Sequence, residues 1–231
     1  MGNDLQKKQI DEMIRTFCHE VKNPLQTISS FSEFTIKKLK NGDLDKIIDY
    51  QENIQVQLNH TTKLLNRLSL FYRIKFRIFD IEIIDINLKT LIYNVLSAME
   101  QSIEKKKLNI KLEIEKNLTL LSDYKHVETI INEIIENAIK YSAKLSNIYI
   151  IGKTIDDEII LTIKNMGQVL TKENLKKIND VINYSSSGFS YSSTAGIGLP
   201  MVKEAAAVLN SKIIFEALDG YNIVSIHFKK K

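Results

Sequence analysis

Two long runs of apolar residues, spaced by alternating steps of three and four, constrain the fold of this chain more than any other feature. This spacing is typical of helices that pack along one narrow seam, as in a coiled coil or a helix bundle. The first run extends from residue 4 to about residue 40, with an interruption at Pro24, and the second ends near Phe76. The seam residues are Ile10, Ile14, Phe17, Val21, Ile28 and Phe31 in the first run, and Ile47, Ile54, Leu58, Leu65 and Leu68 in the second.

A short break, Asn41-Gly42-Asp43, separates the two runs. Gly42 can adopt a positive φ, and Asp43 is placed to cap the second helix. Two helices of roughly 50 Å, at ~1.5 Å per residue, would therefore form an antiparallel hairpin. Because a single hairpin buries only one seam, we expect two copies of the chain to pair as a dimeric four-helix bundle.

From about Ile81 the pattern changes to short strands mixed with helices. We expect strands at 81–87, 108–115, 148–165, 212–218 and 223–229, and helices at 88–105, 124–142, 171–182 and from Pro200 onward. The segment 148–165 reads as a hairpin that turns near Asp156-Asp157, and the last two strands turn at Asp219-Gly220. These signals predict an α+β fold with two domains, a helical hairpin at residues 1–80 and an α/β sandwich at 81–231.

Composition narrows the range of functions. Lys and Arg total 32 against 28 Asp and Glu, and a net charge of +4 is small for a nucleic-acid binder, so no nucleic acid is expected as a partner. No run reaches the ~18 apolar residues that a membrane helix needs, which predicts a cytoplasmic chain without direct membrane insertion. All arginines lie in the first 80 residues. A phosphate bound by the second domain would therefore meet lysines, backbone amides or a metal ion.

The first motif is FCHEVKNPLQTI, residues 17–28. His19 lies two residues from both Phe17 and Val21, so it should face solvent opposite the seam. An exposed histidine can act as a nucleophile through a ring nitrogen, and the adjacent Glu20 could orient or deprotonate the ring. Asn23, one helical turn further along, shares the same helix face.

The second motif is NEIIENAIKYS, residues 132–142. Glu133 and Asn137 are four residues apart, and their oxygen atoms are the ligand type that a magnesium ion prefers. Lys140 could neutralise phosphate charge, and Tyr141 follows it. Taken alone, this spacing is also common on any exposed polar helix face.

Two glycine motifs follow in the chain. The motif IKNMGQVL, residues 163–170, runs from a strand into Asn165 and Gly167. The side-chain amide of Asn165 could pair with a polar ring edge, and Gly167 would let a flat base approach the backbone. TAGIGLPMVK, residues 194–203, places Gly196 and Gly198 before a helix begun by Leu199-Pro200, where backbone amides and the helix dipole can receive phosphate.

In their order and spacing the four motifs resemble the H, N, G1 and G2 boxes of the bacterial sensor histidine kinases of two-component signalling. The resemblance covers nearly the whole chain. It implies a dimerisation and phosphotransfer hairpin, followed by a catalytic domain with the ATP-binding fold of gyrase-type ATPases. It also implies ATP and Mg²⁺ as cofactors, a homodimer, and a response-regulator receiver domain as partner. The chain would then be the cytoplasmic core of a sensor.

Residue by residue, the resemblance makes His19 the phosphoacceptor and Glu20 its acid/base partner. Asn23 would position water for dephosphorylation of the regulator. The residues that it assigns to the nucleotide are Glu133, Asn137 (also the metal ligand), Lys140, Tyr141, Asn165, Gly167, Gly196, Ile197, Gly198 and Leu199. A hinge around residues 72–80 would let ATP reach His19 and then withdraw.

The chain departs from the family pattern at several positions. Glu133 replaces the usual first asparagine of the N box, Val169 the second glycine of the G1 box, and Thr194 the first glycine of the G2 box. Asn165 replaces the adenine-reading aspartate, so its contact with the adenine amino group would lack charge assistance. The phenylalanine-rich lid segment is not recognisable, and Phe189 or Tyr191 could stand in for it.

These departures leave two other functions open. The chain could be a histidine phosphotransfer or scaffold protein whose degenerate nucleotide domain no longer uses ATP. It could also be a dimeric binding module without enzymatic activity. Stabilisation by ATP would separate both from a kinase, because a ligand that binds only the native state raises stability by mass action.

Overall fold

The computed structural model of the protein describes residues 2–42, 44, 46–78, 80–183 and 198–230. These residues divide into two compact units, one up to residue 73 and one from residue 74 onward. None of the helices in these ranges is long and apolar enough to cross a membrane.

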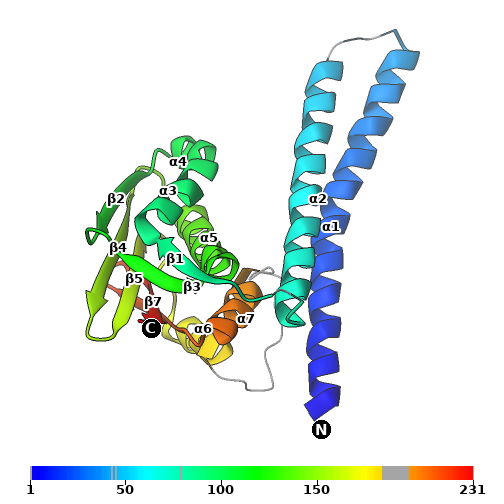
Figure 1. The fold of residues 1–231 in the computed structure, drawn as a ribbon. Coiled ribbons are helices and arrows are strands. Elements are labelled where there is room, and N and C mark those ends of the chain that lie inside the picture. Colours follow the sequence, from blue (N-terminus) through cyan, green and yellow to red (C-terminus); the bar gives the residue numbers. More distant parts are fainter. Residues whose placement is uncertain (1, 43, 45, 79, 184–197, 231) are drawn as a thin grey trace. The chain divides into compact units, whose positions relative to one another are not determined.

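The first unit is a pair of long helices, as the sequence predicts. Helix α1 spans Gly2–Lys40 and helix α2 spans Ile47–Lys75, and they lie side by side (Figure 1). The rings of Phe31 and Tyr50, 5.6 Å apart, join the two helices near the turn. Gly42 has a φ of +70°, as expected for the turn, whereas the predicted cap at Asp43 lies outside the described residues.

The seam of the second helix differs from the prediction. Leu58 and Leu65 are 42% and 51% exposed, and the buried positions of α2 within the first unit are instead Thr61, Leu64 and Phe71. Thr61 can be buried because its hydroxyl donates to the carbonyl of Gln57. The sequence carries apolar residues on more than one face of α2, and a single hairpin buries only one of them. Leu58 and Leu65 belong to a face that remains exposed in the single chain.

The second unit is built on a mixed five-stranded sheet with the strand order β2-β4-β5-β7-β6. Strand β2 pairs with β4 in parallel, and all the other pairs are antiparallel. The strands are β2 (Asn109–Ile114), β4 (Asn147–Ile155), β5 (Glu158–Met166), β6 (Lys212–Leu218) and β7 (Tyr221–Lys229). The predicted turns are confirmed by positive φ angles at Asp156, Asp219 and Gly220. A smaller sheet pairs β1 (Ile83–Asn87) with β3 (Thr119–Asp123), a strand that the sequence pattern did not predict.

Five helices complete this unit: α3 (Leu88–Ala98), α4 (Glu100–Lys106), α5 (Tyr124–Tyr141), α6 (Lys172–Asn183) and α7 (Gly198–Leu209). The single helix predicted at 88–105 is wrong, because α3 ends at Met99, whose φ and ψ of −110° and 8° are not helical. Helices α3, α5 and α7 lie together against the main sheet (Figure 1).

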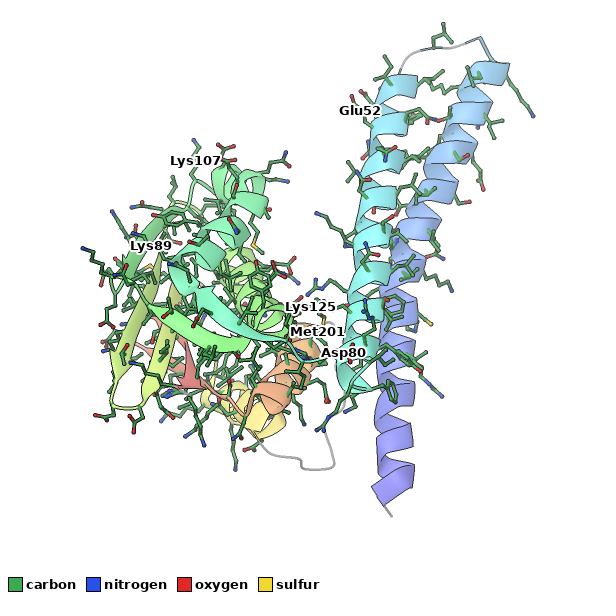
Figure 2. The ribbon with its side chains drawn as sticks, viewed as in Figure 1. Glu52, Asp80, Lys89, Lys107, Lys125 and Met201 are labelled. Atoms are coloured by element: carbon green, nitrogen blue, oxygen red, sulfur yellow. The ribbon has the colours of Figure 1, made fainter. Side chains whose placement is uncertain are left out.

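The core lies between this helix layer and one face of the sheet. Along β5 the side chains of Ile159, Leu161 and Ile163 are buried, while the residues between them are half-buried. Ile134 on α5 is almost completely buried. Met201 on α7 is buried as well, whereas Lys89 and Lys107 are exposed (Figure 2). The predicted α+β sandwich is therefore confirmed.

Candidate functional site

The first candidate residues lie on α1, in the first unit. Phe17 and Pro24 are buried, whereas His19 and Asn23 are exposed and Glu20 is half-buried. His19 and Asn23 are four residues apart on one helix, so they share a face. A histidine ring in this position is open to a reacting group from outside the hairpin.

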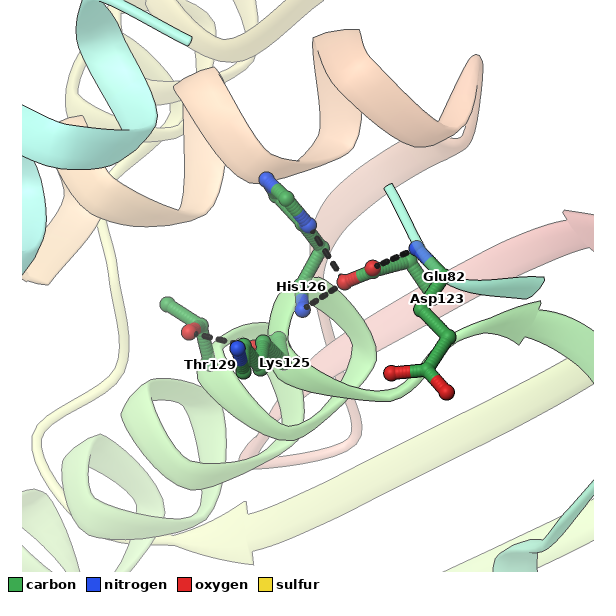
Figure 3. A network of polar contacts seen from close by, with 5 residues as sticks. All are labelled: Glu82, Asp123, Lys125, His126 and Thr129. Atoms are coloured by element: carbon green, nitrogen blue, oxygen red, sulfur yellow. Dashed lines mark hydrogen bonds and ion pairs between the residues drawn. The ribbon is translucent and has the colours of Figure 1, made fainter. Parts of the chain in front are cut away.

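In the second unit, a buried carboxylate fixes the start of α5 (Figure 3). The Asp123 carboxylate accepts hydrogen bonds from the backbone N–H groups of His126 (3.0 Å) and Glu82 (2.9 Å), and it lies 2.6 Å from Nδ1 of the buried His126 ring. Burial alone would raise the pKa of Asp123, but the contacts with His126 and Glu82 outweigh it and hold the pKa below its usual value. Sequence reasoning missed this pair; its signal is an Asp at the N-cap position before an apolar helical run.

Helix α5 presents the second motif. Glu133 is only 3% exposed, and Asn137, one turn later, is half-buried. The alternative of an ordinary exposed polar face is therefore wrong at Glu133. Lys140 and Tyr141 are exposed at the C-terminal end of the helix, where the Lys140 ammonium lies 5.2 Å from the centroid of the Tyr141 ring.

A lysine from another helix holds this end of α5 in place. Lys106 Nζ, at the end of α4, lies within hydrogen-bond distance of the carbonyl oxygens of Ile139 (2.9 Å), Lys140 (2.6 Å) and Ser142 (3.0 Å). Carbonyl groups at a helix C-terminus lack helical partners and carry negative partial charge, so an ammonium group is a favourable cap. Lys106 thereby fixes the backbone around Lys140 and Tyr141.

The third motif packs directly against this end of α5. Gly167 forms an isolated β-bridge with Ser142, and the N–H of Ala143 donates to the Met166 carbonyl at 2.9 Å. A Cβ atom on Gly167 would lie 2.0 Å from the Tyr141 carbonyl oxygen. Glycine is therefore required here by the backbone of α5, a reason different from the approach of a flat base that the sequence suggested.

Asn165 lies two residues earlier, at the end of the buried row of β5. Its side chain is 6% exposed, and its Nδ2 atom has no hydrogen-bond partner among the described residues. Because β5 alternates, Asn165 shares the helix-covered face with Ile163. An orphaned amide N–H group at this position fits a ligand that brings an acceptor atom.

A second buried asparagine, which sequence reasoning missed, shapes the segment after β5. Asn222 lies opposite Asn165 in the register of β5 and β7 and is 7% exposed. Its Nδ2 donates to the Gln168 carbonyl at 2.9 Å, and its Oδ1 accepts from the N–H of Leu170 at 2.9 Å. No local pattern around Asn222 distinguishes it, because both of its partners are more than 50 residues away.

The fourth motif is described only in part. Gly198 is the first residue of α7 and is buried, Leu199 is half-buried, and Pro200 follows within the first turn. Gly196, Ile197 and Thr194 lie outside the described residues, as do the lid candidates Phe189 and Tyr191. Helices α5 and α7 pack together, so the described part of this motif lies in the same layer as the second motif.

The second unit thus joins three motif segments around α5, and His19, Glu20 and Asn23 belong to the other unit. Among the described residues no group of three or more His, Cys, Asp or Glu side chains could hold a metal ion. The amide oxygen of Asn137 remains a suitable donor for Mg²⁺, because a hard cation accepts oxygen ligands and completes its shell with phosphate and water.

Comparisons with known proteins agree with this arrangement. Residues 122–231 match the family described as histidine kinase-, DNA gyrase B-, and HSP90-like ATPase. The sensor histidine kinase YxdK of Bacillus subtilis is 25% identical over 203 residues, which cover 87% of this chain and 59% of YxdK. The sensor histidine kinase GraS of Staphylococcus epidermidis is 21% identical over 216 residues, which cover 94% of this chain and 59% of GraS. The chain therefore spans well under two thirds of the length of these relatives.

Solved structures share the fold. The histidine kinase AdeS of Acinetobacter baumannii superposes with a TM-score of 0.71 at 18% identity, covering 92% of this chain and 98% of the AdeS chain. The histidine kinase ThkA, in a crystal structure with the response regulator protein TrrA, gives a TM-score of 0.69 at 20% identity and covers 98% of this chain and 63% of that one. Along most of its length the chain is similar to bacterial sensor histidine kinases, and residues 122–231 form an ATPase domain of the histidine kinase-, DNA gyrase B-, and HSP90-like family.

Proposed function

We propose that this chain is a protein-histidine kinase that autophosphorylates His19 with ATP and passes the phosphoryl group to an aspartate of a response regulator. The observation that supports this most is the junction at the end of α5. There Gly167 packs on the Tyr141 carbonyl, and Lys140 and Asn165 belong to the same junction. Residues 81–231 would be the catalytic domain and residues 1–80 the dimerisation and phosphotransfer domain.

In this proposal each part of the junction binds one part of the nucleotide. The Asn165 amide would contact the base, and Tyr141 and Lys140 would lie along the nucleotide, with Glu133 on the same helix. The backbone amides of Gly198 and Leu199, at the start of α7, would bind the phosphates, aided by the helix dipole. Gly196 and Ile197, which precede them in the sequence, would do the same. Asn137 would hold Mg²⁺, which when bound neutralises charge on the phosphates.

His19 would attack the γ-phosphorus through a ring nitrogen while the bond to the leaving ADP oxygen breaks. Phosphoryl transfer depends mainly on positioning and charge neutralisation, so the protein needs an accessible nucleophile of the correct tautomer. The exposed ring of His19 supports this role. Glu20 would hold the tautomer, and Asn23, on the same helix face, would position water when the regulator is dephosphorylated.

A homodimer and a receiver domain are the proposed partners. The apolar side chains of α1 and α2 that stay exposed in the single chain, among them Leu25, Leu58 and Leu65, support a second copy of the hairpin as their cover. The structure of ThkA with the response regulator protein TrrA supports a partner of that class for this chain. We place the chain in the cytoplasm, where such a regulator would meet it.

Incubation with γ-labelled ATP and Mg²⁺ tests the proposal. We expect label on the wild-type chain and on His60→Ala, a control at an exposed histidine of α2, and none on His19→Ala. ATP should still raise the melting temperature of His19→Ala, because the nucleotide site lies in the other unit. Equal labelling of His19→Ala and the wild-type chain would refute the assignment.

A histidine phosphotransfer protein is the second candidate, and the neutral Asn165 favours it because it lacks the charge of the family's aspartate. That function predicts no stabilisation by ATP and no label from ATP. It predicts label on His19 when a phosphorylated donor protein is supplied.

A further inference from the structure

The buried amide of Asn165 is not explained by the protein around it. Its side chain continues the buried row of Ile159, Leu161 and Ile163, where every other member is apolar. Its Nδ2 atom is buried and has no hydrogen-bond partner among the described residues. Buried polar groups in native proteins nearly always have partners, so an orphaned donor points to an acceptor that arrives from outside the chain.

The side chain of Asn222 does not supply that acceptor. Asn222 stands directly opposite Asn165 in the pairing of β5 with β7, close enough for the two side chains to be cross-strand neighbours. Both ends of the Asn222 amide are already used, by the Gln168 carbonyl and by the N–H of Leu170. Asn222 thus holds the segment after β5 in place and leaves Asn165 available for a ligand.

The chemistry of an amide differs from that of a carboxylate in a way that matters for a nucleotide base. An ionised carboxylate only accepts hydrogen bonds, so it suits the exocyclic amino group of adenine and repels the O6 oxygen of guanine. A carboxamide both donates and accepts. It can accept from the amino group of adenine while donating to a ring nitrogen, or donate to O6 of guanine while accepting from N1–H.

We propose that the base site accepts guanine as well as adenine, with affinities for guanine and adenine nucleotides within about tenfold of each other, and that Asn165 sets this range. The proposal rests on the proposed function, namely that this end of β5 contacts the base of a nucleotide. It extends that function to a wider substrate class, purine nucleoside triphosphates.

Calorimetric titration of the whole chain with ADP, GDP and CDP tests the proposal. These diphosphates carry no γ-phosphate, so binding is measured without phosphoryl transfer. We expect ADP and GDP to bind with dissociation constants within about tenfold of each other, and both to bind more tightly than CDP. In Asn165→Asp, GDP should weaken by at least about tenfold relative to ADP, because two acceptor oxygens then face O6.

Asn174→Asp is the matched control, because it makes the same chemical change at an exposed position in the first turn of α6. It should leave the ratio of the two dissociation constants unchanged. The wild-type ratio decides the range of bases by itself, even if Asn165→Asp fails to fold.

The possible failures are distinguishable. ADP binding with GDP more than about tenfold weaker in the wild-type chain would overturn the inference and leave the proposed function standing. An unchanged ratio in a folded Asn165→Asp variant would show that another residue reads the base, which also overturns the inference. No binding of either ADP or GDP would overturn the proposed nucleotide function together with it.

Discussion

Replacement of Gly167 by alanine adds a single methyl group, but it should disrupt the junction between the end of β5 and the end of α5. A Cβ atom there would lie 2.0 Å from the Tyr141 carbonyl oxygen, which belongs to the rigid end of α5. Relief to ordinary van der Waals contact needs a separation larger by about 1.4 Å. Neither group can rotate away, because both are held by backbone, so the end of β5 and the end of α5 must move apart.

The cost follows from the contacts that such a movement breaks. Overpacking of a tight site typically costs about 1–3 kcal/mol. The hydrogen bond from the Ala143 N–H to the Met166 carbonyl would also be lost, at roughly 0.5–1.5 kcal/mol. We therefore expect Gly167→Ala to lower the free energy of unfolding of the second unit by about 2–4 kcal/mol. Nucleotide affinity should fall as well, because Lys140, Tyr141 and Asn165 lie at this junction.

Urea denaturation followed by circular dichroism measures the first effect, and nucleotide titration measures the second. With a slope of about 2 kcal/mol per molar urea, in the middle of the usual range, the midpoint should fall by roughly 1–2 M. Gly152→Ala on β4 is the matched control, because the nearest atoms to its Cβ would be the flexible ends of Ile114 and Leu118, at 3.0 Å. If Gly167→Ala unfolds at the same urea concentration as Gly152→Ala, the reasoning about the junction is refuted.

Two further predictions concern the start of α5 and the outer face of α2. Because the pKa of Asp123 is lowered in the folded state, its stabilisation is fully present above the unfolded pKa of about 3.9 and is lost as pH falls through the folded value. Asp123→Asn should therefore cost about 1–3 kcal/mol of unfolding free energy at pH 7, and this difference should shrink below roughly pH 4. A constant difference across pH would contradict the explanation that contacts with His126 and Glu82 lower the pKa of Asp123. Leu65→Glu, on the exposed face of α2, should shift the chain from dimer to monomer in sedimentation equilibrium. Lys63→Glu, at another exposed position of α2, should leave the dimer intact. A dimer that survives Leu65→Glu would place the dimer interface elsewhere.

Much of the fold follows from local sequence signals. The long helices show in their apolar spacing, and the hairpins in the residues at Asp156 and Asp219-Gly220, which adopt the positive φ angles that such turns need. The break at Met99 carries neither glycine nor proline, so no local signal marks it. Strand β3 is short and pairs only with β1, more than 30 residues earlier, and such pairing is set by tertiary contacts.

The candidate site likewise contains features that the sequence predicts and features that depend on the packing of distant elements. The residue types of the four motifs mark His19, Asn137 and Asn165 from the sequence alone. The reason for Gly167 was not visible there, because the atom that excludes a Cβ belongs to Tyr141 in a different element. The role of Asn222 likewise depends on contacts with Gln168 and Leu170 in the segment after β5. Sequence spacing predicts which residues share an element, and the packing of elements decides what those residues contact.

Locating the phosphoryl group after incubation with ATP and Mg²⁺ tests the central claim most directly. Tryptic digestion at neutral pH should release residues 16–22 as one peptide, and mass spectrometry can then determine whether it carries the added phosphoryl group. We predict one phosphoryl group on His19, lost in acid and retained in alkali, as expected for a bond from phosphorus to a ring nitrogen. A phosphoryl group that survives acid, or that lies on a peptide without His19, would contradict the account.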